Sequence, residues 1–357
     1  MISFKFGIAL LLFTFFVWEQ RKLGEISNII AGGDKNINKI KKYGKYPVIA
    51  NSINKNGIVG YYDNEYRVKA PAVTVTGRGE IGHAVARFQN FTPIVRLLAL
   101  SSKLDPIFLA NSINKIRFFN ESTGVPQLTK PQLSTYSIII PSVEEQNNIG
   151  KLILLIEKYI HLHQRKLESF QFTYHEIIRR LFLKKAKWQQ TKLSDLVTIL
   201  DKNRKPVKKE DRLLGDTPYY GANGIQDYIS GFTHKGEFIL IAEDGANSLT
   251  EYPIYFVKGQ IWVNNHAHVL KVNRDVSPLF LALALKQINY SKYTVGSSRN
   301  KLNLKDLENI TIFIPDNNEQ QKIGQFYSNY LNYLRINKKR IQYMKQFKQF
   351  LLQNMFI

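Results

Sequence analysis

An internal repeat constrains this chain more than any other feature of its sequence. The segment that begins IIIPSVEEQNNIG at Ile138 returns as IFIPDNNEQQKIG at Ile312, so Pro141 and Pro315 stand 174 residues apart. Each copy contains an apolar, strand-like run, then a proline, then a long helical pattern. Self-similarity at a fixed period is typical of one structural unit used more than once. The sequence therefore predicts a tandem repeat of two units.

Each long helical pattern carries an apolar seam with the spacing of a coiled coil. Seam positions alternate four and three residues apart, as heptads do; they are Ile149, Ile153, Ile156, Ile160, His163, Leu167, Phe170, Tyr174, Ile177 and Leu181, and then Ile323, Tyr327, Tyr330, Leu334, Asn337, Ile341, Met344, Lys348, Leu351 and Met355. We expect the two helices to bury these seams on each other as an antiparallel coiled coil, on the order of 50 Å long at about 1.5 Å per residue. His163 and Asn337 occupy equivalent seam positions and are predicted to fix the register.

The segments outside the helices predict two globules of mixed α/β (α+β) structure. Runs such as Ala72–Thr76 and Gly236–Ile241 are short, apolar and bounded by turn residues, which is typical of strands. Trp18–Ile30 has a counterpart in Trp188–Leu200, so each globule opens in the same way. The predicted division is an apolar start at 1–17, a first domain at 18–141, a helix at 142–187, a second domain at 188–315 and a helix at 316–357.

The apolar start does not predict a membrane anchor. Gly7–Trp18 is a run of 12 residues, whereas a spanning helix needs about 20. No small-residue cleavage site follows it, so we expect no export signal, and expect residues 1–17 to pack on the first domain or to stay disordered. The chain has no cysteine and so forms neither disulfides nor thiolate metal sites. A cytoplasmic location without membrane contact is expected.

The charge of the chain favours a polyanionic partner. The formal net charge is +22 and 12% of residues are aromatic, a combination that suits nucleic acid better than a membrane surface. A generally basic proteome is the alternative source of part of this excess. Several turn segments are rich in Lys, Arg, Asn, Ser and Tyr, and one of them, Lys202–Arg212, carries six basic residues against two acidic ones. Basic side chains bind phosphates, and Arg and Asn can read base edges.

No enzyme active site is predicted. The sequence has no glycine-rich phosphate loop followed by Lys-Ser/Thr, and no Asn-Pro-Pro-Tyr or Asp-Pro-Pro-Tyr methyltransferase motif. His266 and His268 would share one face of an extended strand, but without a third ligand they predict no metal site. Glu243 and Asp244 precede Gly245 and are interpreted as part of a turn.

These motifs together resemble the specificity subunit of a type I restriction–modification system. The resemblance runs from Trp18 to the C-terminus and rests on WEQRKLGEI at Trp18, IPSVEEQNNI at Ile140, their copies at Trp188 and Pro315, and the phrases YYGANGI at Tyr219, EDGA at Glu243 and NHAH at Asn265. It implies two target-recognition domains, each reading one half of a split, asymmetric double-stranded DNA target. The long helices would act as the spacer between the half-sites.

The resemblance also implies partners. Two methyltransferase subunits would bind around the spacer, and restriction subunits would join that complex. S-adenosylmethionine, ATP and magnesium would belong to those partners, so no cofactor or metal is expected in this chain. The chain itself is predicted to be a non-catalytic recognition subunit.

Candidate DNA-binding residues follow from loop chemistry and motif position. Those in the first domain are Asn51, Lys55 and Arg78; those in the second are Tyr219, Tyr220, Asn223, His266 and Arg299. Two other classes of function stay open at this point. One is a structural coiled-coil scaffold that binds DNA without sequence preference, and the other is a stand-alone restriction nuclease or methyltransferase.

Overall fold

The computed structural model describes residues 18–119, 124–183, 188–296 and 300–356. Its contacts divide the chain into two units, which we call the first and second units. The first extends to Gln164 and takes in the chain again from Arg340, while the second is Arg165–Lys339. This grouping differs from the predicted division because each globule packs on parts of both long helices. The predicted limits, including the segment 1–17 outside the described residues, stay a prediction.

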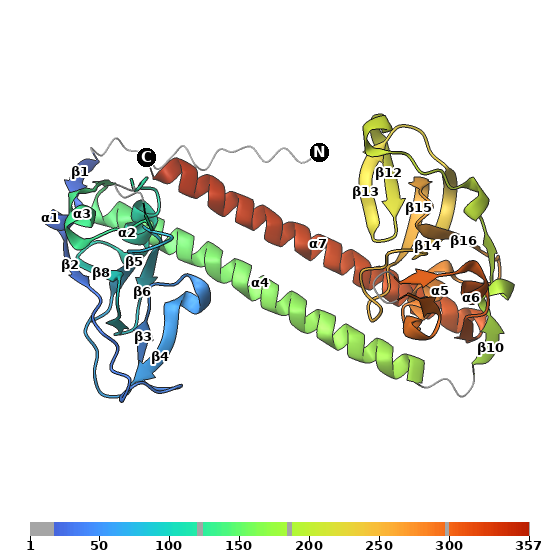
Figure 1. Ribbon diagram of the computed structural model, residues 1–357, viewed down its shortest axis with the longest axis horizontal. Coiled ribbons are helices and arrows are strands. Elements are labelled where there is room, and N and C mark those ends of the chain that lie inside the picture. The colour runs from blue at the N-terminus through green and yellow to red at the C-terminus, as the bar shows by residue number, and fades with distance from the viewer. Residues whose placement is uncertain (1–17, 120–123, 184–187, 297–299, 357) are drawn as a thin grey trace. The chain divides into compact units, whose positions relative to one another are not determined.

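The two long helices begin in the same way. Helix α4 spans Val143–Leu183 and helix α7 spans Asn317–Met355 (Figure 1). Ser142 Oγ accepts a hydrogen bond from the Glu145 amide at 3.2 Å, and Asp316 Oδ1 accepts one from the Glu319 amide at 2.9 Å, so each helix has a side-chain N-cap. These caps satisfy amides that no helical carbonyl can reach.

The repeated glutamine and glycine that follow each proline have structural roles. Gln146 and Gln320 are buried, and their Nε2 atoms donate to the carbonyls of Pro141 at 2.9 Å and Pro315 at 3.0 Å. A Cβ at Gly150 would lie 2.2 Å from Asp105 Oδ1, and one at Gly324 would lie 2.8 Å from Ser277 Oγ.

Asp105 and Ser277 are the N-caps of α2 (Pro106–Ile113) and α5 (Pro278–Leu285). The glycines therefore let each globule's helix approach a long helix closely.

Within each unit, the segments of α4 and α7 pair antiparallel. In the first, Ile149 and Ile153 cluster with Phe356, and Lys348 Nζ lies 2.6 Å from Glu157 Oε1. In the second, the rings of Tyr174 and Tyr330 stack with centroids 3.4 Å apart and an interplanar angle of 4°. The ring centroids of Phe170 and Tyr333 lie 4.1 Å apart. Later residues of α4 meet earlier residues of α7 in both units, so the predicted antiparallel pairing is confirmed within each.

The predicted seam is wrong at the end of α4. Ile177 is 46% exposed, whereas Ile178 and Phe182 are buried at 3% and 6%. The Phe182 ring lies 5.4 Å from that of Trp188 and 6.1 Å from that of Phe280. Beyond Tyr174 the helix packs on the globule of the second unit. Its buried residues there are spaced four apart and no longer follow the heptad. His163 is half-buried, and its ring centroid lies 4.1 Å from that of Tyr159 in a tilted arrangement. Asn337 Nδ2 donates to the Tyr333 carbonyl. The predicted contact between His163 and Asn337 stays a prediction.

The first unit has a four-stranded antiparallel sheet in the order β2-β8-β5-β6, made of β2 (Ser27–Ala31), β8 (Leu97–Ser102), β5 (Ala72–Thr76) and β6 (Ala84–Arg87). Leu23, Val73 and Val75 belong to the core that forms with α2 and α3 (Lys130–Thr135) on one face. Ala72, Leu97 and Ala99 belong to a second core. The other elements are β1 (Glu19–Lys22) paired with β9 (Ser137–Ile140), α1 (Leu23–Ile26), and a sheet of β4 (Ile58–Tyr62), β3 (Tyr46–Ile49) and β7 (Thr92–Pro93).

The second unit has a six-stranded sheet in the order β11-β16-β14-β15-β12-β13. Its strands are β11 (Val197–Ile199), β16 (Ala267–Val272), β14 (His234–Ala242), β15 (Ile254–Val263), β12 (Leu214–Gly221) and β13 (Gly224–Ile229). Only β12 and β15 pair in parallel among the described strands of this sheet. The remaining elements are β10 (Gln189–Lys192) paired with β19 (Thr311–Ile314), β17 (Thr294–Val295) paired with β18 (Lys301–Leu302), and α6 (Leu304–Glu308).

The two units repeat each other down to strand register. The same three-strand alignment occurs at Leu100 with Ile29 and Val73, and at Leu270 with Ile199 and Ile239. The ends of β5 and β14 also match. The Thr76 amide donates to the His83 carbonyl, and the Ala242 amide donates to the Pro253 carbonyl. Strands β2, β8, β5 and β6 thus correspond to β11, β16, β14 and β15. Among the helices of the described segments, none is both long and apolar enough to cross a membrane.

Tyr174 supplies a test of the pairing in the second unit. Tyr174→Ala should lower the free energy of unfolding by about 3 kcal/mol because it empties a buried ring site. Its hydroxyl is buried and lacks a hydrogen-bond partner in the described chain, so Tyr174→Phe should raise stability by about 1 kcal/mol. Denaturant unfolding measures both. Phe172, which is 71% exposed on the same helix, gives the control Phe172→Ala; equal losses at the two positions would contradict the pairing.

Candidate nucleic-acid interface

An asparagine holds two loops together in each unit, and we call this contact the asparagine clasp. Asn51 follows β3; its Nδ2 donates to the Arg78 carbonyl at 2.8 Å, and its Oδ1 accepts from the amides of Gly77 at 2.7 Å and Arg78 at 3.3 Å. Asn223 lies between β12 and β13; its Nδ2 donates to the Gly245 carbonyl at 2.9 Å. Its Oδ1 accepts from the Asn247 amide at 3.0 Å.

Both asparagines thus fasten the loop that follows the equivalent strands β5 and β14. Their amides are used by main-chain groups, so the geometry supports a positioning role rather than direct base contact.

The other first-unit candidates lie at the loops that Asn51 joins. Lys55 is exposed and has a φ of 49°, in the left-handed region. Arg78 is half-buried, and its backbone bridges to Gln127. In the described part of the chain, no side chain or carbonyl pairs with the Arg78 guanidinium. A Cβ at Gly77 would lie 2.4 Å from the Arg96 carbonyl oxygen, so only glycine fits the turn that presents Arg78.

The tyrosine pair of the second unit divides into a core residue and a surface residue. Tyr219 is 1% exposed, and its hydroxyl accepts from the Val207 amide at 3.0 Å and donates to the Val207 carbonyl at 3.3 Å. The Arg212 guanidinium stacks 4.2 Å from its ring. Tyr220 is half-buried, and burial raises the pKa of its hydroxyl. Tyr219 is therefore placed to shape the interface, while Tyr220 is accessible.

The segment Lys202–Arg212 uses its two kinds of basic residue differently. The side chains of Arg204 and Arg212 are only 15% and 14% exposed and pair with carboxylates of the second unit. The four lysines of the segment are exposed: Lys202, Lys205, Lys208 and Lys209. The Trp262 Nε1 atom donates to the Lys205 carbonyl at 2.7 Å and holds the segment against β15. The lysines, rather than the arginines, are exposed to an anionic partner.

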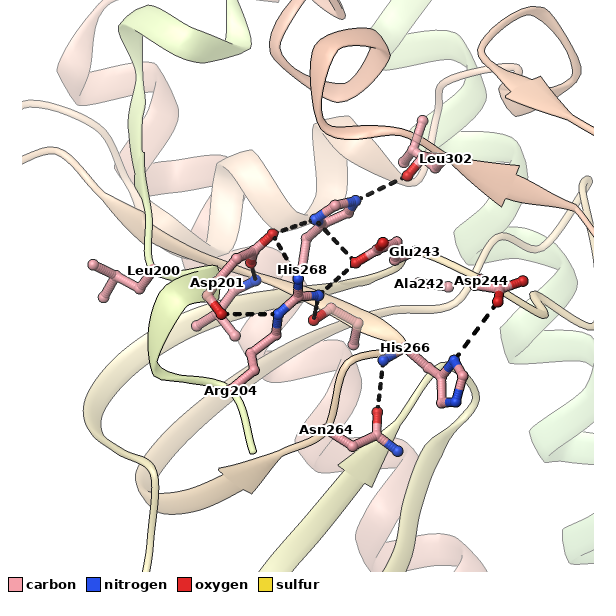
Figure 2. Close-up of polar contacts among 12 residues, drawn as sticks. Leu200, Asp201, Arg204, Ala242, Glu243, Asp244, Asn264, His266, His268 and Leu302 are labelled. Carbon is pink, nitrogen blue, oxygen red and sulfur yellow. Dashed lines mark hydrogen bonds and ion pairs between the residues drawn. The ribbon is translucent and has the colours of Figure 1, made fainter. Parts of the chain in front are cut away.

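A largely buried network of charged residues includes Arg204 of this segment. Figure 2 shows Arg204 between two carboxylates. Its Nη1 lies 2.5 Å from Glu243 Oε2 and its Nη2 lies 3.3 Å from Asp201 Oδ2. His268 Nδ1 lies 2.6 Å from Asp201 Oδ2, and its Nε2 lies 2.9 Å from the Leu302 carbonyl oxygen.

Burial opposes ionisation of Asp201. Four favourable interactions outweigh it and lower the Asp201 pKa: the hydrogen bond with His268, the charge interaction with His268, the hydrogen bond from the Val269 amide, and the charge of Arg204. This network was not predicted from the sequence, although Asp201 and Arg204 have the spacing of a local ion pair. The partners from β14 and β16 are distant in sequence and could not be assigned from it.

Three residues of this network have the side-chain types of metal ligands. Ligand atoms of Asp201, Glu243 and His268 lie within 4.8 Å of one another. The guanidinium of Arg204 already supplies the positive charge between the carboxylates, and a cation would have to displace it. That no metal binds in this chain stays a prediction.

His266 and His268 do not act as a pair. His268 lies in β16 and is 1% exposed, whereas His266 precedes the strand and is half-buried. His266 Nδ1 lies 3.8 Å from Asp244 Oδ2, to one side of the network in Figure 2. The Gly245 amide donates to the Asn300 carbonyl at 3.1 Å. The turn at Asn223, the loop at Gly245 and the segment from Asn300 therefore meet, while Arg299 lies outside the described residues.

The comparisons with known proteins agree with this arrangement. The family model for the type I restriction modification DNA specificity domain matches residues 17–170 and again 185–346. This chain belongs to that family. The two matches correspond to the two copies of the internal repeat.

Individual relatives match part of the chain. A putative type I restriction enzyme specificity subunit of Haemophilus influenzae is 44% identical over 131 residues, which are 37% of this chain and 34% of that protein. A putative type I specificity subunit of Mycoplasma pneumoniae is 30% identical over 138 residues, 37% of this chain and 41% of the relative. The matches thus span about two fifths or less of the length of these curated relatives.

Solved structures share the fold over nearly the whole chain. The S subunit of a type I restriction–modification system from M. genitalium has a TM-score of 0.74 at 18% identity and covers 98% of each chain. A chain from a study of complex assembly and conformational transition of the type I system has a TM-score of 0.52 at 13% identity, covering 94% of this chain and 96% of that one. The predicted architecture of two tandem globules and two long helices is confirmed as a fold of this family.

The asparagine clasp predicts a local loss of protection. Asn51→Ala removes the acceptor of the Gly77 and Arg78 amides, so their hydrogen exchange should accelerate, with a stability loss of about 1 to 2 kcal/mol. Amide exchange measured by NMR reports both amides. Asn54→Ala is the matched control, since the Asn54 side chain is exposed in the neighbouring loop. Unchanged exchange at Gly77 in Asn51→Ala would show that the clasp does not hold the turn.

The lowered pKa of Asp201 predicts a pH-dependent stability. Asp201→Asn should destabilise the chain by about 3 kcal/mol at neutral pH, because it removes one partner of a buried ion network. The folded-state pKa lies below the ordinary value of 3.8, so this contribution is present above pH 3.8 and is lost as the pH falls below it. Thermal melts across that range should show the difference from the unaltered chain shrinking in acid. The exposed Asp216 provides the control Asp216→Asn; a pH-independent difference for Asp201→Asn would contradict the assignment.

Proposed function

We propose that this chain is the specificity subunit of a type I restriction–modification complex. Each unit reads one half of a split, asymmetric double-stranded DNA target, and the long helices set the spacing between the half-sites. The observation that carries this proposal is the duplicated family match together with the duplicated asparagine clasp, which positions basic and polar loops in each unit. A net charge of +22 and the exposed lysines of the second unit favour phosphate contacts.

Recognition would divide between positioning and reading. Exposed lysines such as Lys55 and Lys205 would contact phosphates, which carry affinity but no sequence information. Arg78, Tyr220 and His266 are the candidates for base contact among the predicted residues, because their side chains are at least partly accessible. Asn51, Asn223 and Tyr219 would act by holding those loops.

The chain would direct catalysis by others rather than perform it. We propose two methyltransferase subunits and restriction subunits as partners, with S-adenosylmethionine, ATP and magnesium bound by them. The sequence supports this division because it lacks a phosphate loop and a methyltransferase motif. A specificity-free scaffold is less well supported, since nothing in such a role requires the loops to be clasped in both units.

Methylation mapping tests the proposal. The chain is co-purified with its methyltransferase subunit and incubated with a random DNA library and S-adenosylmethionine, and methylated sites are read by sequencing. One split motif, methylated only when the chain is present, is expected. Methylation without a motif, or the same motif without the chain, would reject the proposal.

The spacer role has a separate test. Inserting four residues into α4 and four into α7 lengthens both helices by about 6 Å at 1.5 Å per residue. The gap between the two half-sites should then increase by one or two base pairs, while both half-sites keep their sequences. Methylation mapping of the variant measures this. An unaltered gap would show that the helices do not set the spacing.

A further inference from the structure

A small polar pocket lies in the first unit, away from the core that β5 forms with α2. Its enclosed volume is only about 10 Å³, and it opens to solvent; its lining residues are Ser52, Ile53, Asn56, Thr74, Thr76, His83, Val85, Arg87 and Leu97. Thr74 and Thr76 alternate along β5 with Val73 and Val75, which belong to that core. The pocket therefore opens on the other face of the sheet, beside the loop that carries Lys55.

Arg87 brings a positive charge into this pocket without a negative partner. Its Nε donates to Thr74 Oγ1 at 2.9 Å. In the described ranges, no carboxylate or carbonyl accepts from its two terminal nitrogens. Burial lowers the Arg87 pKa to about 10, so the guanidinium stays charged at neutral pH. A half-buried cation with unused donors is costly unless an anion joins it.

The second unit shows that the fold does not need these polar residues. By strand register, Thr74, Thr76, His83 and Arg87 correspond to Leu240, Ala242, Pro253 and Val257. All four residues of the second unit are buried and apolar or proline. At these positions the same sheet is thus covered by an apolar core in one unit, whereas in the other it carries polar side chains, of which Thr74 and Thr76 are buried and Arg87 is half-buried. A purely structural role does not account for this difference.

We propose that the Arg87 guanidinium, which lines this small pocket, binds a backbone phosphate of the DNA half-site read by the first unit. The proposal rests on the DNA-binding function proposed above. The terminal nitrogens of Arg87 offer the paired donors that suit phosphate oxygens, and Lys55 lies in the adjoining loop. Arg78 follows two residues after Thr76, so an anion held here would place the DNA beside a candidate base-reading residue. The lining has no aromatic ring other than the His83 imidazole to stack a base, which favours phosphate over an extruded nucleobase.

The salt dependence of DNA binding tests the pocket directly. The full chain and its Arg87→Gln variant are titrated with fluorescent double-stranded DNA of random sequence over a series of NaCl concentrations. Losing one phosphate contact should reduce the slope of log K against log salt by about 0.9. Arg87→Lys should retain most of the slope, because it retains the charge.

Lys103→Gln is the matched control. Lys103 is exposed just beyond the Ser102 end of β8, whereas the pocket-lining Leu97 begins that strand. Its slope should equal that of the unaltered chain. If Arg87→Gln does not fold, Thr74→Val serves instead. It removes the hydroxyl that accepts from Arg87 Nε and donates to the Val85 carbonyl at 3.4 Å, and should weaken DNA binding without changing the melting temperature by more than a few degrees.

Each result has one meaning. A reduced slope for Arg87→Gln with an unchanged control supports the pocket. Equal slopes for Arg87→Gln and the unaltered chain overturn the pocket but leave the proposed function standing, as does an equal reduction in the control. Failure of the unaltered chain to bind DNA at all overturns the proposed function and the pocket with it.

Discussion

The close approach of a globule to a long helix is the constraint on which each unit depends. At Gly150 and at Gly324 there is no room for a side chain, because the N-cap residue of α2 or α5 lies against the helix. The adjacent glutamine is buried and closes the first turn onto the proline carbonyl. These contacts explain why the sequence repeats a glutamine and a glycine at the same distance after each proline. They also fix where the sheets of each unit stand on the paired helices.

From that fixed base, the two units carry the same scaffold but different surfaces. Strand register, helix caps and the asparagine clasp recur, so the loops that could meet DNA are presented in the same way twice. What differs is chemistry at equivalent positions: a polar pocket with Arg87 in the first unit, an apolar core around Leu240 in the second, and a buried Asp201–Arg204 network found only in the second among the described residues. A repeated frame with unlike surfaces is what reading two different half-sites requires.

The sequence was informative where periodicity and local signals decide structure. It predicted the repeat, the long helices, their antiparallel pairing and the position of Asn51 and Asn223 in loops. It failed at Ile177 because the helix there packs on the globule of the second unit, and a heptad pattern does not predict that contact. It also treated Arg204, Arg212 and Tyr219 as surface residues, because their partners come from strands far away in the sequence. The alternation of threonine in Ala72–Thr76, against leucine and alanine in the equivalent strand, was the signal that could have indicated the pocket.

The central claim is that each unit presents its own reading surface through its own clasp. Methylation motifs of the complexes formed with Asn51→Ala and with Asn223→Ala test this most directly. The account predicts that each substitution blurs one half of the split motif and leaves the other half unchanged, with opposite halves affected by the two variants. If either substitution blurred both halves equally, or neither, the claim of two independent reading units would be contradicted.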